Sequence, residues 1–409
     1  MACQVVNFRV VFRRMLKHKG NRKFYYLDNA AATPIDHRVL KVMSGAQKKY
    51  GNPSSYNNVG RLARAEMESA RLTIARFFGA RTEEIIFTSS GSEANNLALI
   101  GALANLKGTV LTTPIEHPSV LEPLKKLKNI NLKLIPVDKE GAVDLKVFEK
   151  ILTTDCRLVS VMYANNEIGT IQPIRQIAKI IKDFKTRNSK LETRNFPLFH
   201  VDACQATGFL NMNVQHLGVD LLTFNGSKIY GPRGIGVLYV RRGTKLNSLI
   251  SGGSQERGLR AGTENVPTIA GLAKAISIIK TTETKKVSVI RDYAINKLKK
   301  NIPDVLINGP MREERLANNI SICIPNLDSE NLLLELDRYG ISAGSGSACT
   351  SHAVEPSHVL KAIGVPAKYI NGALRFSLGR ETTKKDIDYL VKSLIKIIAN
   401  LTKRYARLR

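Results

Sequence analysis

Residues 84–106 read EIIFTSSGSEANNLALIGALANL, and this stretch is the clearest guide to the class of fold. Its first part is a short apolar run that ends at serine and glycine, which is typical of a buried β-strand. Its second part carries apolar residues three and four positions apart, which indicates a helix. A strand that leads directly into a helix is the repeating unit of α/β proteins.

The same alternation continues from residue 82 to about residue 239. Short apolar runs predict strands at 108–114, 132–138, 157–163, 197–202 and 220–225, and helical spacing appears at 117–129, 144–152 and 174–184. We therefore predict an α/β fold, with a mostly parallel sheet covered by helices on both faces.

Beyond the apolar run at 233–242 the pattern changes. Helical segments dominate, and strands are predicted only at 318–325 and 372–379, which indicates a smaller α+β domain. We divide the chain into a basic N-terminal extension (1–25), a large domain (26–283) and a small C-terminal domain (284–409). The first residues of the large domain are expected to pack with the small one.

Length and composition fit a folded two-domain protein. The chain has 409 residues, 43% of them hydrophobic, and no apolar run is long enough to span a bilayer, so no membrane association is expected. The cysteines are widely spaced and form no C-x-x-C pair, which argues against a disulfide framework and a zinc site and favours a reducing cytoplasm. They are Cys3, Cys156, Cys204, Cys323 and Cys349.

The charge is strongly basic, with 62 Lys and Arg against 34 Asp and Glu. Nucleic-acid binding is one interpretation. The excess is spread over many helices without interleaved aromatic residues, so we favour a solvated lysine-rich surface and do not expect direct nucleic-acid binding. The basic N-terminus is either a tail, a stretch upstream of a true start near Met15, or a targeting peptide, which would place the protein in an organelle.

Polar residues follow the predicted strands where each strand ends, which is where ligands bind in parallel sheets. Alone, each has an ordinary explanation, such as a helix cap, a turn or a histidine whose hydrogen bonds are made within the fold. Together they suit pyridoxal phosphate. Lys228 would bond to its aldehyde, Asp202 would keep the ring nitrogen protonated, and Gln205 would bind the ring hydroxyl. The phosphate would lie at Gly91 and Ser92, with His117 on the ring.

Several stretches carry a resemblance to a known family. They include TSSGSEANN (88–96), HVDACQATG (200–208), GSKIYGPRGIG (226–236), ERGLRAGTEN (256–265) and GSGSACTS (344–351). From about Tyr26 to Glu381 the chain resembles cysteine desulfurases of the NifS/IscS type, in the class V aminotransferase group. The resemblance implies fold type I, with a seven-stranded sheet in the pyridoxal-phosphate-binding domain, a homodimer, and a catalytic cysteine loop in the small domain.

The resemblance also implies roles for single residues. The catalytic set is Lys228, Cys349 and His117. The further cofactor contacts are Asn166, Asn225, Ser227 and, from the second subunit, Thr263. Asn166 and Arg375 would bind the substrate, although a structural salt bridge is an equal alternative for Arg375. Ser227 stands where many relatives have histidine, so it can bind phosphate but cannot carry charge.

The implied reaction removes sulfur from L-cysteine, leaving L-alanine and a persulfide on Cys349. Glycine and serine around Cys349 suit a loop that carries the persulfide to an acceptor: an iron–sulfur scaffold, a transfer-RNA thiolation relay or a thiamine-pathway protein. The only metal role expected is that of Cys349 as a transient iron–sulfur ligand. Alternatives are selenocysteine lyase, another class V enzyme, or a basic nucleic-acid-binding or scaffold protein on an inactive enzyme fold.

Overall fold

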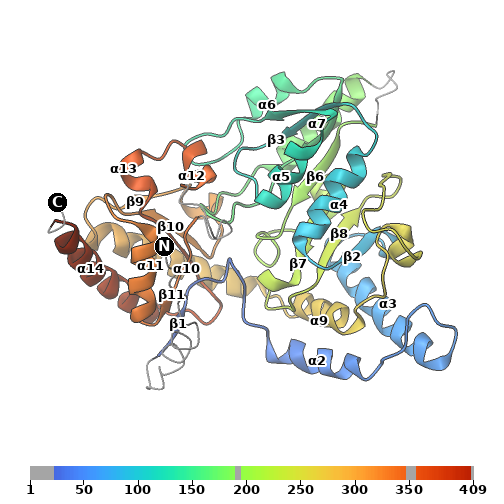
Figure 1. Ribbon diagram of the computed structural model, residues 1–409, viewed down its shortest axis with the longest axis horizontal. Coiled ribbons are helices and arrows are strands. Elements are labelled where there is room, and N and C mark those ends of the chain that lie inside the picture. The colour runs from blue at the N-terminus through green and yellow to red at the C-terminus, as the bar shows by residue number, and fades with distance from the viewer. Residues whose placement is uncertain (1–22, 189–194, 347–355, 407–409) are drawn as a thin grey trace, which may run out of the picture.

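The computed structural model describes residues 23–188, 195–346 and 356–406 (Figure 1). Its centre is a seven-stranded sheet in the order β2-β8-β7-β6-β5-β3-β4. Only β8 runs antiparallel to its neighbours, so the predicted α/β class and mostly parallel sheet are confirmed. The strands are β2 (Ile85–Thr88), β3 (Gly108–Thr112), β4 (Ile130–Leu134), β5 (Cys156–Ser160), β6 (Leu198–Asp202), β7 (Leu221–Asn225) and β8 (Gly236–Val240).

Helices cover both faces of this sheet, because successive side chains of each strand point to opposite sides. Ile85 and Phe87 of β2 belong to one core, while Ile86 between them belongs to the other. The first core takes in α3 (Asn58–Phe78), α6 (Leu145–Ile151), α7 (Ile174–Arg187) and α9 (Val266–Ser277). The second takes in α4 (Gly91–Leu103) and α5 (Pro118–Lys126).

The C-terminal part has its own core, on the left in Figure 1. An antiparallel sheet in the order β12-β10-β9 packs with three helices. These elements are β9 (Leu306–Ile307), β10 (Asn319–Cys323), β12 (Ala373–Ser377), α10 (Thr281–Asn301), α11 (Ser329–Arg338) and α14 (Lys384–Ala406). The predicted domain boundary at 283–284 falls inside α10 and stays a prediction.

The first residues that the structure describes join the two cores. β1 (Tyr25–Tyr26) pairs in parallel with β11 (Ile341–Ser342). The chain then crosses to the central sheet and enters α2 (His37–Gln47); we call residues 27–34 the crossing segment. It is held at both sides, because the Ala30 amide donates to Ser377 Oγ (2.8 Å) and the Thr33 amide donates to the carbonyl of Ser227 (2.8 Å).

None of the helices in the described ranges is both long and apolar enough to cross a membrane.

Candidate active site

A cavity of about 300 Å³ opens at the carboxyl ends of the parallel strands, below the crossing segment. We call it the front cavity. It brings together nine of the residues that sequence reasoning proposed, although they come from segments nearly 300 positions apart. They are Gly91, Ser92, His117, Asn166, Asp202, Gln205, Asn225, Lys228 and Arg375.

Asp202 ends β6 and is only 6% exposed. Its Oδ1 accepts the amide of Cys204 (2.9 Å), and its Oδ2 accepts Nδ2 of Asn95 (2.8 Å). Both donors are neutral, and a buried carboxylate is costly unless it meets positive charge. The arrangement therefore suits a cationic ligand group such as a protonated ring nitrogen.

Hydrogen bonds connect Asp202 to His117 through two residues that sequence reasoning missed. Asn95 Nδ2 also donates to Ser119 Oγ (2.8 Å), which lies 2.8 Å from His117 Nδ1. The Ser119 amide donates to the same Nδ1 (3.1 Å), so the neutral ring carries its proton on Nε2. Burial lowers the pKa of His117, which favours this neutral form.

Lys228 follows β7 in a short 3-10 turn, Gly226–Lys228. Its Nζ donates to the Ala31 carbonyl (2.5 Å), and Nε2 of Gln205 donates to the Ala30 carbonyl (3.0 Å). The crossing segment thus lies over both side chains. Ser227 does not line the front cavity, and its hydroxyl donates to Oδ1 of Asn225 (3.1 Å).

Gly91 begins α4 at the cavity wall, where Ser90 caps the helix by accepting the Glu93 amide. A Cβ at Gly91 would lie 2.7 Å from Cys204 Sγ and 2.9 Å from Asn225 Nδ2, so only glycine fits without displacement. A helix start free of side-chain bulk is a suitable place for phosphate.

Burial, followed by the charge of Asp202, raises the pKa of the Cys204 thiol well above its usual value, so it stays protonated.

Arg375 of β12 reaches the same cavity from the C-terminal core. Its Nη2 forms an ion pair with Asp28 (2.9 Å), and its Nη1 donates to the Asn166 carbonyl (3.2 Å). Its Nε is buried and has no hydrogen-bond partner. The structural salt bridge is therefore present, and the guanidinium keeps further N–H groups that could bind a carboxylate ligand.

Besides Ser227, two more predicted site residues are not among the described residues that line the front cavity. Thr263 is exposed and does not line the front cavity, and its role stays a prediction. Cys349 lies outside the described residues, as does its predicted role as an iron–sulfur ligand. In the described ranges no three His, Cys, Asp or Glu side chains lie where they would hold a metal ion together.

A buried carboxyl group next to His117 was also missed. Glu116 Oε1 accepts the Met162 amide (2.9 Å) and the Thr113 hydroxyl (2.7 Å), whereas its Oε2 is buried without a partner. Burial raises the pKa of Glu116 to about 8, so it is mostly protonated at neutral pH. The only signal in the sequence was an acidic residue directly before a strand-end histidine.

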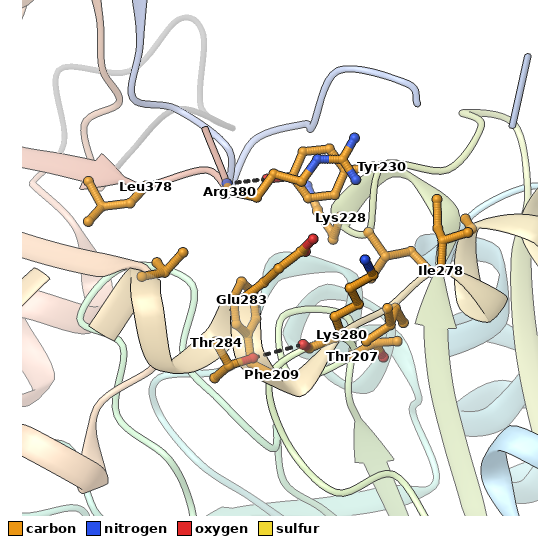
Figure 2. Close-up of a pocket in the computed structure, with 15 residues that line it drawn as sticks. Thr207, Phe209, Lys228, Tyr230, Ile278, Lys280, Glu283, Thr284, Leu378 and Arg380 are labelled. Carbon is orange, nitrogen blue, oxygen red and sulfur yellow. Dashed lines mark hydrogen bonds between the residues drawn. The ribbon is translucent and has the colours of Figure 1, made fainter. Parts of the chain in front are cut away.

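Lys228 also borders a second, smaller hollow of about 40 Å³, which we call the rear cavity (Figure 2). Its walls include Phe209, Ile279, Val287 and Leu378. Arg380 stacks on the Tyr230 ring at 4.1 Å, and its amide donates to the Tyr230 hydroxyl (2.8 Å). This volume holds a few water molecules at most.

The front cavity fits pyridoxal phosphate. Its volume suits a small organic cofactor, and a lysine and a buried carboxylate border it together. Oδ1 of Asn95 is buried beside it without a partner, as is Nε of Arg375, so the wall has unused hydrogen-bonding capacity. Lys228 and Asp202 would hold the cofactor, and the start of α4 would receive its phosphate.

Comparisons with known proteins point the same way. The family model for aminotransferase class-V matches residues 25–390. The chain is 45% identical to "Cysteine desulfurase IscS" of Dictyoglomus turgidum and 42% identical to "Cysteine desulfurase" of a Nostoc species, in each case over 92% of this chain and at least 93% of the relative. A solved "NIFS-LIKE PROTEIN" aligns over 92% of this chain and 100% of its own, with 37% identity and a TM-score of 0.84. A NifS-like protein from Rickettsia africae aligns over the same share of this chain, with 33% identity and a TM-score of 0.81.

Proposed function

The chain belongs to the aminotransferase class-V family, and from this premise we propose that it removes sulfur from L-cysteine and leaves L-alanine and a persulfide on Cys349. It is a cysteine desulfurase that depends on pyridoxal phosphate. The observation that carries the proposal is the front cavity, where Lys228, Asp202 and Arg375 face one volume. These side chains supply an amine, a buried anion and a donor for carboxylate.

Bound pyridoxal phosphate would supply an electron sink for the α-carbon of the substrate. Lys228 would anchor the cofactor. Asp202 would keep a proton on its ring nitrogen, and Asn95 orients that carboxylate through its 2.8 Å hydrogen bond. Burial lowers the pKa of His117 and so favours its neutral form, and in the tautomer described above its Nε2 would act as a proton donor.

Sulfur transfer to Cys349 is balanced without an external oxidant. The thiolate of Cys349 attacks the substrate sulfur, the carbon–sulfur bond breaks, and a sulfur–sulfur bond forms. The carbon receives the bond electrons and a proton, which yields alanine. Arg375 would orient the substrate through its carboxylate, because its side chain lines the front cavity and keeps N–H groups that no described residue accepts.

The test is the Cys349→Ala variant. We expect it to bind the cofactor but to release no alanine from L-cysteine and to form no persulfide, while it keeps part of its turnover of L-selenocysteine, because selenium leaves more readily. Alanine release on both substrates and peptide mass spectrometry measure this. Cys156→Ala is the matched control, since burial raises the pKa of that thiol to about 12 and makes it unreactive. Wild-type turnover of L-cysteine by Cys349→Ala would overturn the mechanism.

We further propose a homodimer that acts in the cytoplasm, with an organelle as the alternative, and an iron–sulfur scaffold or transfer-RNA thiolation relay as acceptor. The dimer is supported by exposed tyrosines near the start of α3, since Tyr50 is 83% and Tyr56 is 89% exposed. In such a dimer the exposed Thr263 would reach the partner's phosphate site. Sedimentation of a fully active monomer would contradict it.

A further inference from the structure

A second buried carboxyl group, on Glu167, lies just outside the machinery described above. Glu167 follows β5 and is only 4% exposed. Its Oε2 accepts the Ser357 hydroxyl at 2.5 Å. A Cβ built on Gly346 would lie 2.3 Å from the same Oε2, so the Gly346 backbone already packs against this carboxyl group.

Gly346 and Ser357 flank the stretch that carries Cys349. Residues 347–355 lie outside the described residues, but the chain on both sides of them is described. One carboxyl group therefore meets the residue where the chain enters this stretch and a residue just beyond where it leaves. Holding two chain ends together reduces the number of conformations open to the residues between them.

The turn that presents Glu167 is fixed on several sides. Oδ1 of Asn165 accepts the amides of Glu167 (2.8 Å) and Ile168 (2.9 Å). Nδ2 of Asn319, in β10, donates to the Glu167 carbonyl (3.0 Å). The carboxyl group is thus part of a rigid turn at the edge of the central sheet, and it cannot follow the chain ends if they move.

The Ser357 hydroxyl has two functions at once. Its oxygen accepts the amides of Val359 (3.1 Å) and Leu360 (3.2 Å) and so caps α12 (His358–Ala362), while its proton goes to Glu167. A capping role alone would not require a buried carboxyl partner. The contact therefore links the start of α12 to the strand-end turn.

The same turn contacts Arg375. The Asn166 carbonyl accepts its Nη1, and Gly344 forms an antiparallel bridge with Arg375, whose amide donates to the Gly344 carbonyl (2.7 Å). Burial is the largest influence on the pKa of Glu167 and raises it to about 7. The positive charge of Arg375, which is itself paired with Asp28, acts in the opposite direction and lowers this pKa.

We propose that Glu167 is a positioning residue that holds together the two ends of the Cys349-bearing stretch, through Ser357 and the Gly346 backbone, and thereby limits the conformations open to that stretch. The inference rests on the proposed role of Cys349. Glu167 itself touches neither substrate nor cofactor in this scheme.

The first experiment compares holoenzymes of wild type, Glu167→Ala, Glu167→Gln and Ser357→Ala. We expect Glu167→Ala and Ser357→Ala to lower the single-turnover rate of persulfide formation about tenfold, with cofactor content and the KM for L-cysteine nearly unchanged. Glu167→Gln keeps an oxygen that accepts the Ser357 proton and should restore most of the rate. Asp328→Ala, which removes an equivalent cap from α11, controls for cap loss alone.

The second readout does not depend on activity. Amide hydrogen exchange in residues 341–346 and 357–361 should accelerate at least fivefold in Glu167→Ala and remain close to wild type in Glu167→Gln. If wild-type enzyme released no alanine from L-cysteine, the proposed function would be wrong, but this measurement would still test the contact.

The third experiment uses the close approach at Gly346. Gly346→Ala introduces a methyl group against the Glu167 carboxyl group, so it should slow persulfide formation in the wild-type background. In the Glu167→Ala background the obstructing atom is absent, so the same substitution should add little further loss. Additive effects of the two changes, or wild-type rates and exchange in both single variants, would overturn the proposal, as would a Glu167→Gln variant as slow as Glu167→Ala.

Discussion

The front and rear cavities both border Lys228, yet they differ in what lines them. The front cavity, about 300 Å³, contains a carboxylate met by neutral donors and two buried polar atoms without partners. The rear cavity, about 40 Å³, is lined by apolar and charged side chains, and among the described residues lining it no buried polar side-chain atom lacks a partner. Unused hydrogen-bonding capacity, together with the larger volume, is why we assign the chemistry to the front cavity.

The largest expected effect is at the residue that the two cavities share. Lys228→Ala should abolish covalent cofactor attachment and turnover, because no other lysine lines the front cavity in the described part of the chain. Borohydride reduction followed by peptide mass spectrometry measures the attachment. Lys280→Ala, which changes an exposed lysine of the rear cavity, should keep both properties. A reduced label on any other lysine would refute the assignment.

The next effect concerns the front cavity alone. Asp202→Asn should reduce kcat for alanine formation by roughly 10²–10⁴-fold, because a neutral amide no longer holds the proton on the ring nitrogen. The fold should persist, since the amide keeps an oxygen that can accept from the Cys204 backbone. Thermal unfolding and kcat are measured together. Near-normal turnover would contradict the proposed use of this cavity.

In the rear cavity, by contrast, we expect a loss of stability without a loss of catalysis. Val287→Ala removes buried methyl groups from α10 and should lower the free energy of unfolding by roughly 1–3 kcal/mol. The kcat of the holoenzyme should stay within about twofold of wild type, because Val287 itself carries no reactive group. A tenfold fall in kcat at unchanged cofactor content would show that the two cavities are functionally coupled.

The smallest effect concerns Glu116, behind His117. Its pKa is raised from 4.5 to about 8, so the folded protein binds this proton more tightly than the unfolded chain does. The contribution to stability is complete below about pH 4.5 and is lost as the pH rises towards 8. Glu116→Gln should therefore become more stable relative to wild type as the pH rises from 5 to 8. A stability difference that does not change with pH would contradict this.

Much of the sheet could be predicted because its strands are short apolar runs buried on both faces. The predicted position of β4 was wrong, because the strand spans Ile130–Leu134 and the prediction was 132–138. The strand cannot extend as predicted because Pro136 lacks an amide donor and residues 138–142 form a turn closed by Asp138.

Part of the candidate site could be predicted for a similar reason, because residues that follow parallel strands meet at one edge of the sheet. Contacts between segments that are distant in the sequence could not be predicted. The Asn95–Asp202 hydrogen bond joins residues 107 positions apart, and the Arg375–Asp28 pair joins residues 347 apart. The burial of Glu116 and Glu167 was not predicted, because it depends on which segments pack over them. The roles of Thr263 and Cys349 stay predictions.

The crossing segment has a consequence for protein synthesis. Ser377, which accepts the amide of Ala30, is added to the chain 347 residues after Ala30. At about 5–20 residues per second, the nascent chain waits roughly 17–70 s for this partner. In the later part of that interval the strand ends that line the cavity are already translated, and the crossing segment is held only on that side, through Ser227. Cofactor capture is therefore expected to be a late, post-translational event, which gives the cell a point at which vitamin supply limits how much of this protein matures.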